Sequence, residues 1–383
     1  MAANSPMIEM YRREEVPLLA YGAPTAGVFL VDRFAPIELE YAALRRSCVL
    51  LDLPSRGVVE VRGADRQEFL GRMLTQRVAD QPVRTLCRSF WLNRKGRIDA
   101  DVRVVELGDR TLLEVDVHVA GRVRETLEAF VIADDVVLRD VTEETHRLAV
   151  HGPGGPALIA EIAGDGDVGA MAEGDARVVA IAGIEAIVFR DDSTGDAGME
   201  LIAGVDEIGD VYLELLTKSG AMEDVDRESD DPVSKARMRR AGWHAYNVAR
   251  IEAGTALFMI DFGPDTLPAE SGVIESRIDF GKGCYLGQEV VARMHARGAF
   301  KQRLVGIRVE GEAQPATGSR IEAGGEVVGA VTSSTVSPML GSAIVCFGMV
   351  KAGFVAPGTM VSVEAEGALA SGVVQEGLRF WSR

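Results

Sequence analysis

The sequence is poor in cysteine, has no long hydrophobic run and carries no excess of positive charge. Its four cysteines, Cys48, Cys87, Cys284 and Cys346, are far apart and form no CxxC pair. This spacing excludes a zinc or iron–sulfur ligand set built within one short segment, and we expect neither a metal site nor disulfides. No apolar run reaches the length of a membrane-spanning helix, so we expect no membrane partner. The first residues lack the apolar core of a secretory signal, which favours a cytoplasmic protein.

Acidic residues outnumber basic ones, 58 to 41, which gives a formal net charge of −17. Non-specific binding to nucleic acid depends on Lys and Arg neutralising phosphates, so we expect no direct nucleic-acid partner. The GxSxG, HExxH and GxxxxGKS/T signatures are absent, which argues against the common hydrolases, zinc peptidases and nucleoside triphosphatases. Residues 164–169 match GxGxxG, but no strand precedes them and their two aspartates would repel a pyrophosphate.

The chain of 383 residues is long enough for two or three domains. Its first part alternates between strand and helix patterns. GVVEVRG (57–63) alternates like a strand, residues 64–74 have an apolar helical face, and a hairpin is expected around Gly108-Asp109. A helix is expected over 119–131. This order is typical of an α+β fold.

A similar order of elements follows. Strands are expected at 147–153 and 199–204 and a hairpin at 178–190, with helices at 156–163 and 205–220. The acidic, glycine-rich stretches 164–175 and 222–231 are predicted to be loops.

Short strands separated by glycine turns follow from about residue 300, which predicts a closed or nearly closed β domain. We therefore expect a region of two α+β subdomains over 1–299, with roughly 50–140 inserted between 1–49 and 141–299. The β-barrel domain is expected over 300–383.

Two carboxylates are candidate ligand-binding groups. Asp101 lies in a segment where Asp99, Asp101 and Arg103 alternate with apolar residues. That face is either exposed to solvent or, at Asp101, turned into a cavity where a carboxylate could bind an amine-bearing ligand. Glu200 follows a glycine turn at the start of a strand, and by itself reads as an ordinary exposed glutamate. The long polar loop that ends at 271 is of a length that is often functional.

Cys284 lies in GKGCYLGQE (281–289), between glycines and close to Lys282. Positive charge and open backbone amides stabilise a thiolate, so this is the cysteine placed for chemistry. The alternative is a small residue that is tolerated in a turn. Cys48 and Cys346 have apolar neighbours and are predicted to be buried.

Several segments together resemble the YgfZ/GcvT superfamily of tetrahydrofolate-binding proteins, from about residue 40 to 383. KGCYLGQE resembles the signature of its YgfZ-type branch at every fixed position. The other segments that carry the resemblance are VEVRGADRQEFLGRMLTQ (59–76), LNRKGRIDADVRV (92–104), STGDAGMEL (193–201) and RIEAGTALFMIDFGPDTLPAE (250–270).

The resemblance implies a three-lobed folate-binding fold and supplies roles for individual residues. Asp101 falls on the aspartate that holds the folate near its reacting nitrogens, and Glu200 on the glutamate that pairs with the pterin ring. Phe258 falls where relatives place an aromatic residue against the ligand. Arg250 and Tyr246 are further implied ligand contacts, with Tyr246 standing where glycine-cleavage aminomethyltransferases carry an arginine.

The YgfZ-like resemblance implies a tetrahydrofolate-binding protein that supports iron–sulfur cluster assembly or repair in client enzymes, including tRNA-modifying radical enzymes. Its partners would be folate and iron–sulfur client or assembly proteins. Cys284 would be the working thiol and Lys282 its electrostatic partner. Two alternatives stay open: a folate-dependent aminomethyltransferase or methyltransferase, and a folate-binding scaffold without chemistry.

Overall fold

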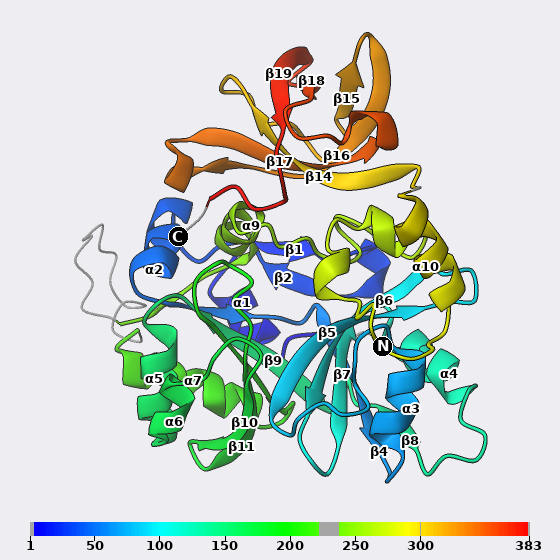
Figure 1. Cartoon of the computed structure of the whole chain (residues 1–383). Helices are drawn as coiled ribbons and strands as arrows, with labels where there is room; N and C mark the ends of the chain where they lie inside the picture. Colours follow the sequence, from blue (N-terminus) through cyan, green and yellow to red (C-terminus); the bar gives the residue numbers. More distant parts are fainter. Residues whose placement is uncertain (1–3, 222–236, 299, 382–383) are drawn as a thin grey trace. The chain divides into compact units, whose positions relative to one another are not determined.

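The computed structural model describes residues 4–221, 237–298 and 300–381, and the loop predicted at 222–231 lies outside them. The chain divides into two compact units (Figure 1). No helix of the described residues is both long and apolar enough to span a membrane. Unit 1 comprises Met1–Phe69, Asp80–Cys87 and Val102–Tyr246, and unit 2 comprises Leu70–Ala79, Arg88–Asp101 and Asn247–Arg383.

The larger sheet of unit 1 carries an apolar core on one face. Over the described residues its strands follow the order β10-β11-β12-β9-β3-β13. Leu148, Val150 and Leu201 join Tyr212 and Leu215 in one buried cluster on this face. Helices α5 and α7 cover it (Figure 1). The elements are β3 (Val49–Asp52), β9 (Thr145–His151), α5 (Gly155–Ala163), β10 (Ala176–Ile181), β11 (Ile184–Arg190), β12 (Gly198–Gly204), α7 (Ile208–Ser219) and β13 (Arg239–Arg240).

The opposite face of the same sheet carries polar side chains. β12 pairs with β9 so that Glu200 lies opposite Ala149 and Gly198 opposite His151, and β11 places Phe189 opposite Glu200. Directly opposed residues of an antiparallel pair share a face. Glu200, His151 and Phe189 therefore lie on the side away from the α5–α7 core.

The smaller sheet contains the first predicted strands. Within the described residues its order is β5-β6-β7-β4-β8, and β5 and β6 contribute residues to both units. The hairpin predicted around Gly108-Asp109 is β6–β7, and the predicted strand at 57–63 is β4. Val58, Val105 and Leu112 of this sheet pack with Phe189 and Ile202 of the larger one. The elements are β4 (Arg56–Arg62), α3 (Arg66–Met73), β5 (Thr85–Leu92), β6 (Ile98–Glu106), β7 (Thr111–Asp116), α4 (Ala120–Glu128) and β8 (Val137–Asp140).

Unit 2 contains a closed barrel, in the order β14-β17-β16-β15-β18-β19 among the described residues. Its interior is filled by Ile307, Ile321, Cys346 and Val363, which are fully buried. The predicted β domain is thus confirmed, and together with the helices and sheets of unit 1 it confirms the α+β class. The strands are β14 (Gln302–Val309), β15 (Arg320–Ala323), β16 (Glu326–Ser337), β17 (Ala343–Lys351), β18 (Met360–Ala365) and β19 (Ala368–Val374).

Helix α9 (Trp243–Glu252) leads to the long polar loop, which contains the short 3-10 helices η2 (Pro268–Glu270) and η3 (Ile274–Ser276). Helix α10 (Gln288–Arg297) follows the KGC segment. The remaining amino-terminal elements are α1 (Ile8–Arg13), β1 (Leu18–Ala20), η1 (Pro24–Ala26), β2 (Phe29–Val31) and α2 (Ile37–Arg46).

The loop predicted at 164–175 needs a correction, because it contains the short helix α6 (Gly166–Gly169). Asp165 caps this helix, since its side chain accepts a hydrogen bond from the backbone of Asp167 at 3.0 Å.

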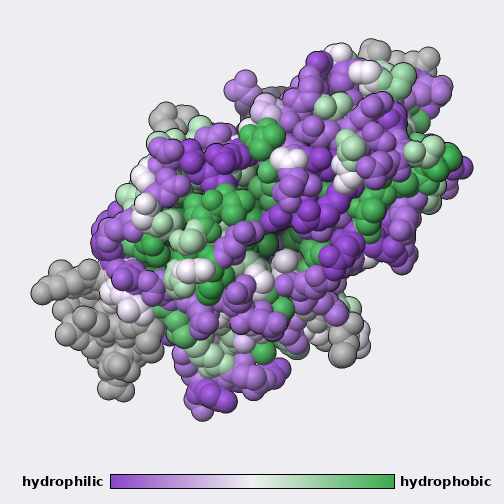
Figure 2. All heavy atoms as spheres, turned by 90° about the horizontal axis from the view of Figure 1, so that it is seen from below, coloured by the Kyte–Doolittle hydropathy of each residue, from purple (hydrophilic) through white to green (hydrophobic). Residues whose placement is uncertain are grey.

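Figure 2 shows hydrophilic residues over most of the face in view, with apolar side chains reaching the surface between them. Scattered exposed apolar residues are normal for a globular protein.

Candidate ligand-binding site

A network of buried charges lies in unit 1. We call it the ionic network; its members are Arg56, Arg103, Glu114, Arg147, Asp191 and Glu200. Glu114 of β7 accepts from Arg56 Nη2 at 2.6 Å and from Arg103 Nη1 at 3.0 Å, and it also contacts Arg147. Burial by itself would raise the pKa of Glu114, but Arg147, Arg56 and Arg103 outweigh it and hold the pKa at about 2.

Glu200 is 1% exposed and is held by two of these arginines. Arg147 Nε lies 2.7 Å from Glu200 Oε2, and Arg103 Nη2 lies 3.6 Å from Oε1. Despite the short distance, Oε2 has no well-directed hydrogen bond from any described residue. The carboxylate is therefore ion-paired but keeps capacity to accept hydrogen bonds.

The polar side-chain atoms of His151 and Thr194 are also buried. Both ring nitrogens of His151 and the hydroxyl of Thr194 lack a partner among the described residues. Burial lowers the pKa of His151, so its ring is neutral at pH 7 and offers one donor and one acceptor. A side chain at Gly198 would collide with this ring, because its Cβ would lie 2.5 Å from His151 Nδ1. Glycine at this position lets the imidazole approach β12.

Tyr246 lies beside His151, with ring centroids 5.6 Å apart. Its hydroxyl is 3.4 Å from Ser193 Oγ, and burial raises the pKa of the phenol. Unpartnered buried polar groups each cost about 1–3 kcal/mol. Because Glu200, His151 and Thr194 all sit in or next to β9 and β12, this part of unit 1 fits a polar ligand.

Asp101 lies in unit 2, where it forms an ion pair with Arg277. Arg277 Nε lies 2.8 Å from Asp101 Oδ1, and Nη2 lies 3.3 Å from Oδ2. This fork-shaped contact orients the carboxylate. The Asp101 side chain keeps 15% of its surface exposed, so one edge of it can meet a ligand.

Cys284 is exposed, as its glycine-rich surroundings predicted. Lys282 points elsewhere: its Nζ donates to the backbone carbonyls of Gly71, Leu74 and Gln76 at 2.5–2.9 Å. An ammonium has three donors, so these contacts use all of them at the carboxyl end of helix α3. Lys282 thus has a structural role of its own, and its action on Cys284 stays a prediction.

Arg250 and Phe258 are both buried in unit 2. Arg250 is fully buried and donates to Asp261 Oδ2 at 2.5 Å and to Ser333 Oγ of β16 at 2.6 Å. Phe258 is 5% exposed and packs edge-on against Phe262. These contacts explain why both side chains are ordered without a ligand, so ligand binding by either stays a prediction.

The ionic network is not apparent from the sequence. Charges that alternate with apolar residues favoured a solvent-facing side for β6, and this was wrong, because Asp99 and Arg103 are only 7% and 6% exposed. The burial of Glu114 and Arg147 was likewise not predicted, because a charged residue in a strand normally indicates a solvent-facing position. The one usable signal is that 145–151 and 198–204 each carry one charged residue among mostly apolar neighbours, Arg147 and Glu200, and that the two charges have opposite sign. Over the described residues, no group of three or more His, Cys, Asp or Glu side chains could hold a metal ion.

Two family profiles match the chain. The GCVT N-terminal domain matches residues 18–276, and the glycine cleavage T-protein C-terminal barrel domain matches residues 302–377. The chain belongs to the GCVT family. The second match coincides with the closed barrel of unit 2.

Similar proteins cover nearly the same length. An aminomethyltransferase of Rubrobacter xylanophilus is 28% identical over 89% of this chain and 85% of its own. An aminomethyltransferase of Geobacillus kaustophilus is 28% identical over 96% and 95%. The crystal structure of the glycine cleavage system aminomethyltransferase T from Bartonella henselae aligns over the full length of both chains, with a TM-score of 0.83 and 20% identity. This structure confirms the GcvT-like fold.

These relatives correct one prediction from the sequence. The KGC segment implied a role in iron–sulfur cluster assembly and in the function of tRNA-modifying enzymes. The similar proteins are instead named aminomethyltransferases, so that reading was wrong. The motif that motivated it covers only eight residues, whereas the family match covers both parts of the chain.

Proposed function

We propose that the protein is a folate-dependent one-carbon transferase of the aminomethyltransferase type. Family membership over both parts of the chain carries this proposal, supported by relatives that match over 85–95% of their own length. The expected reaction passes a methylene group from an aminomethylated carrier protein to tetrahydrofolate, with release of ammonia and of the unsubstituted carrier protein.

Tetrahydrofolate fits the unpartnered groups of unit 1. A pterin ring presents an amino group, ring N–H groups and ring acceptors on one edge. Glu200 offers carboxylate acceptors, while His151 and Thr194 each offer a donor and an acceptor. We propose that Glu200 binds the pterin and that Tyr246 contacts the folate from the same unit.

Asp101 is proposed to lie near the reacting nitrogens. Its carboxylate is oriented by Arg277, so a partly exposed negative charge is held in one position before the ligand arrives. A fixed charge of this kind stabilises positive charge that develops on a nitrogen during transfer. Phe258 and Arg250 are proposed as further folate contacts, and the family resemblance is what supports these two roles.

The proposal is tested by mixing the purified protein with tetrahydrofolate and an aminomethylated carrier protein. We expect methylene-tetrahydrofolate and ammonia to form in equal amounts. Asp101→Ala should lower the transfer rate by roughly 10²–10³-fold, the loss typical of a removed electrostatic group. Asp265→Ala, an exposed carboxylate in unit 2, is the matched control and should leave the rate unchanged. Tight binding of tetrahydrofolate without turnover would instead support the scaffold alternative.

Cys284 and Lys282 remain proposed active-site residues, and KGCYLGQE keeps the YgfZ-type branch within the family as a proposal. Cys284→Ser separates the possible roles in the same assay. A large loss of rate with normal folding would assign the thiol to the chemistry. An unchanged rate would leave Cys284 with the role of a small residue in a turn.

A further inference from the structure

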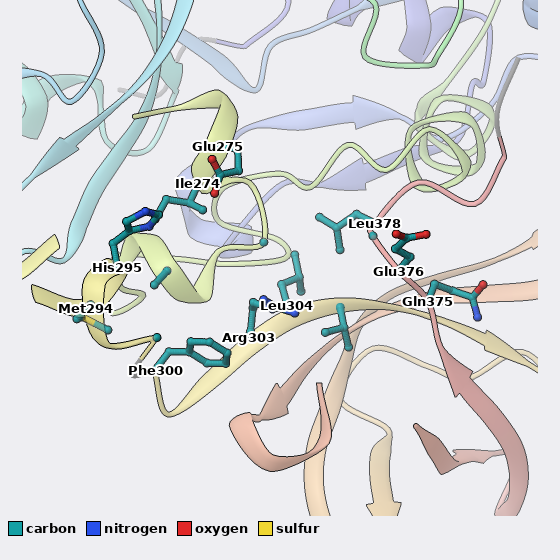
Figure 3. A pocket seen from close by; sticks show the side chains of 15 residues that line it. Ile274, Glu275, Met294, His295, Phe300, Arg303, Leu304, Gln375, Glu376 and Leu378 are labelled. Carbon is teal, nitrogen blue, oxygen red and sulfur yellow. The ribbon is translucent and has the colours of Figure 1, made fainter. Parts of the chain in front are cut away.

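Unit 2 contains a cavity of about 300 Å³ (Figure 3). It is bounded by the η2–η3 segment, helix α10, the start of β14 and the segment 375–378. This volume is at the lower end of the range for small-molecule pockets, so it suits a compact ligand.

One part of the cavity wall is apolar. Leu304 and Leu378 are buried there. Gly272 has a φ of +75°, and a Cβ on it would lie 2.9 Å from Leu304 O and 3.2 Å from Leu378 Cδ1. Any other residue would push these groups apart, so glycine keeps this wall closed. The other apolar side chains of the wall are those of Ile274, Met294 and Phe300.

The same cavity is lined by four ionisable side chains, Arg303, His295, Glu275 and Glu376. Arg303 is half-buried, and its guanidinium lies 5.3 Å from the centre of the Phe300 ring. None of the four makes a hydrogen bond or an ion pair with another described residue, whereas Arg250 and Arg277 of the same unit are both ion-paired. An unpaired, half-buried guanidinium is poised to bind a carboxylate.

We propose that this cavity binds a free amino acid with an apolar side chain. Arg303 would take the carboxylate in its fork of donors, and Glu275 or Glu376 would accept hydrogen bonds from the ammonium. The apolar wall would take the side chain. A simple anion would be repelled by the two glutamates and a simple cation by Arg303, so a zwitterion is the matching charge pattern. A peptide terminus carries only one of the two charges.

The proposal is independent of aminomethyl transfer, and calorimetric titration of the full-length protein tests it directly. L-Leucine, L-methionine and L-phenylalanine are the probes, and we expect saturable binding of at least one. Two analogues of phenylalanine, 3-phenylpropionate and phenethylamine, each lack one of the charged groups. Both should bind at least about tenfold more weakly than the zwitterion, because each loses a charge-assisted hydrogen bond.

Arg303→Gln should weaken binding by at least about tenfold. Arg308→Gln is the matched control, because Arg308 is exposed on the same strand and does not line this cavity. Circular dichroism and thermal unfolding of both variants ensure that a loss of binding does not reflect a loss of folding. Three outcomes would overturn the proposal: no probe binds, both analogues bind as tightly as the zwitterion, or a folded Arg303→Gln protein binds as the wild type does.

Discussion

Arg250 and Asp261 form an ion pair from which solvent is fully excluded, since both side chains are 0% exposed. Asp261 also accepts hydrogen bonds from Thr332 and Ser333 of β16, at 3.0 and 2.6 Å. The pair therefore joins helix α9 and the following loop to the barrel of unit 2. Its members are mutually dependent, because either charge left alone would be buried without compensation.

Asp261→Ala should destabilise unit 2, because it leaves the buried guanidinium of Arg250 unpaired. We expect the free energy of unfolding to fall by about 3–5 kcal/mol, measured by urea denaturation. Asp265→Ala is the control, because that side chain is fully exposed, and it should change stability by less than about 0.5 kcal/mol. Equal stability of the two variants would contradict a stabilising role for the buried pair.

Glu114 should make unit 1 sensitive to acid. Its pKa in the folded protein is about 2, below the ordinary value of 4.5, so its charged form is stabilised by folding. This contribution is fully present above about pH 4.5 and is lost as the pH falls through about 2. Glu114→Gln should therefore be less stable than wild type at pH 7, and the difference should shrink toward pH 2.

Urea unfolding of both proteins across this pH range measures the effect. Glu125→Gln, a change at an exposed glutamate of α4, is the control and should follow the wild-type curve. A difference between Glu114→Gln and wild type that stays constant from pH 7 to pH 2 would show that the ionic network does not titrate as described.

Lys282→Met should destabilise unit 2, because the carbonyls of Gly71, Leu74 and Gln76 would lose a charged donor. We expect a loss of about 1–3 kcal/mol in the free energy of unfolding. Lys95→Met, at an exposed lysine of the same unit, should have almost no effect. If Lys282→Met is as stable as Lys95→Met, the lysine does not anchor the end of α3.

Cys284 should be the first cysteine to react with an aromatic disulfide reagent in the native protein. It is exposed, whereas burial raises the pKa values of Cys48 and Cys346 to about 12, so these two thiols are neutral and shielded at pH 8. Cys284→Ser should remove the fast phase of labelling. A fast phase that survives this substitution would assign the reactive thiol to another residue, with partly buried Cys87 the next candidate.

Local patterns predicted most of the fold because its strands and helices have clear periods. The alternation at 57–63 corresponds to strand β4. The short segments between glycine turns after residue 300 form the strands of the barrel. The exposure of Cys284 and the burial of Cys346 also followed from their neighbours. These properties depend on adjacent residues, which the sequence displays directly.

The ionic network could not be predicted in this way. Glu114, Arg147 and Glu200 come from three strands that are far apart in sequence, and only the pairing of the sheets brings them together. A charged residue in a strand normally indicates solvent, and it is buried only when partners from other strands neutralise it. The carbonyl partners of Lys282 are even more distant, more than 200 residues away along the chain.

The ionic network contains three arginines and three carboxylates, so its charges cancel inside unit 1. The whole surplus of −17 consequently belongs to residues outside it. Such a surplus creates a long-range field that draws basic molecules toward the protein and keeps its copies apart in dilute salt. Encounters with a positively charged carrier would accelerate as ionic strength falls, and those with an acidic one would slow.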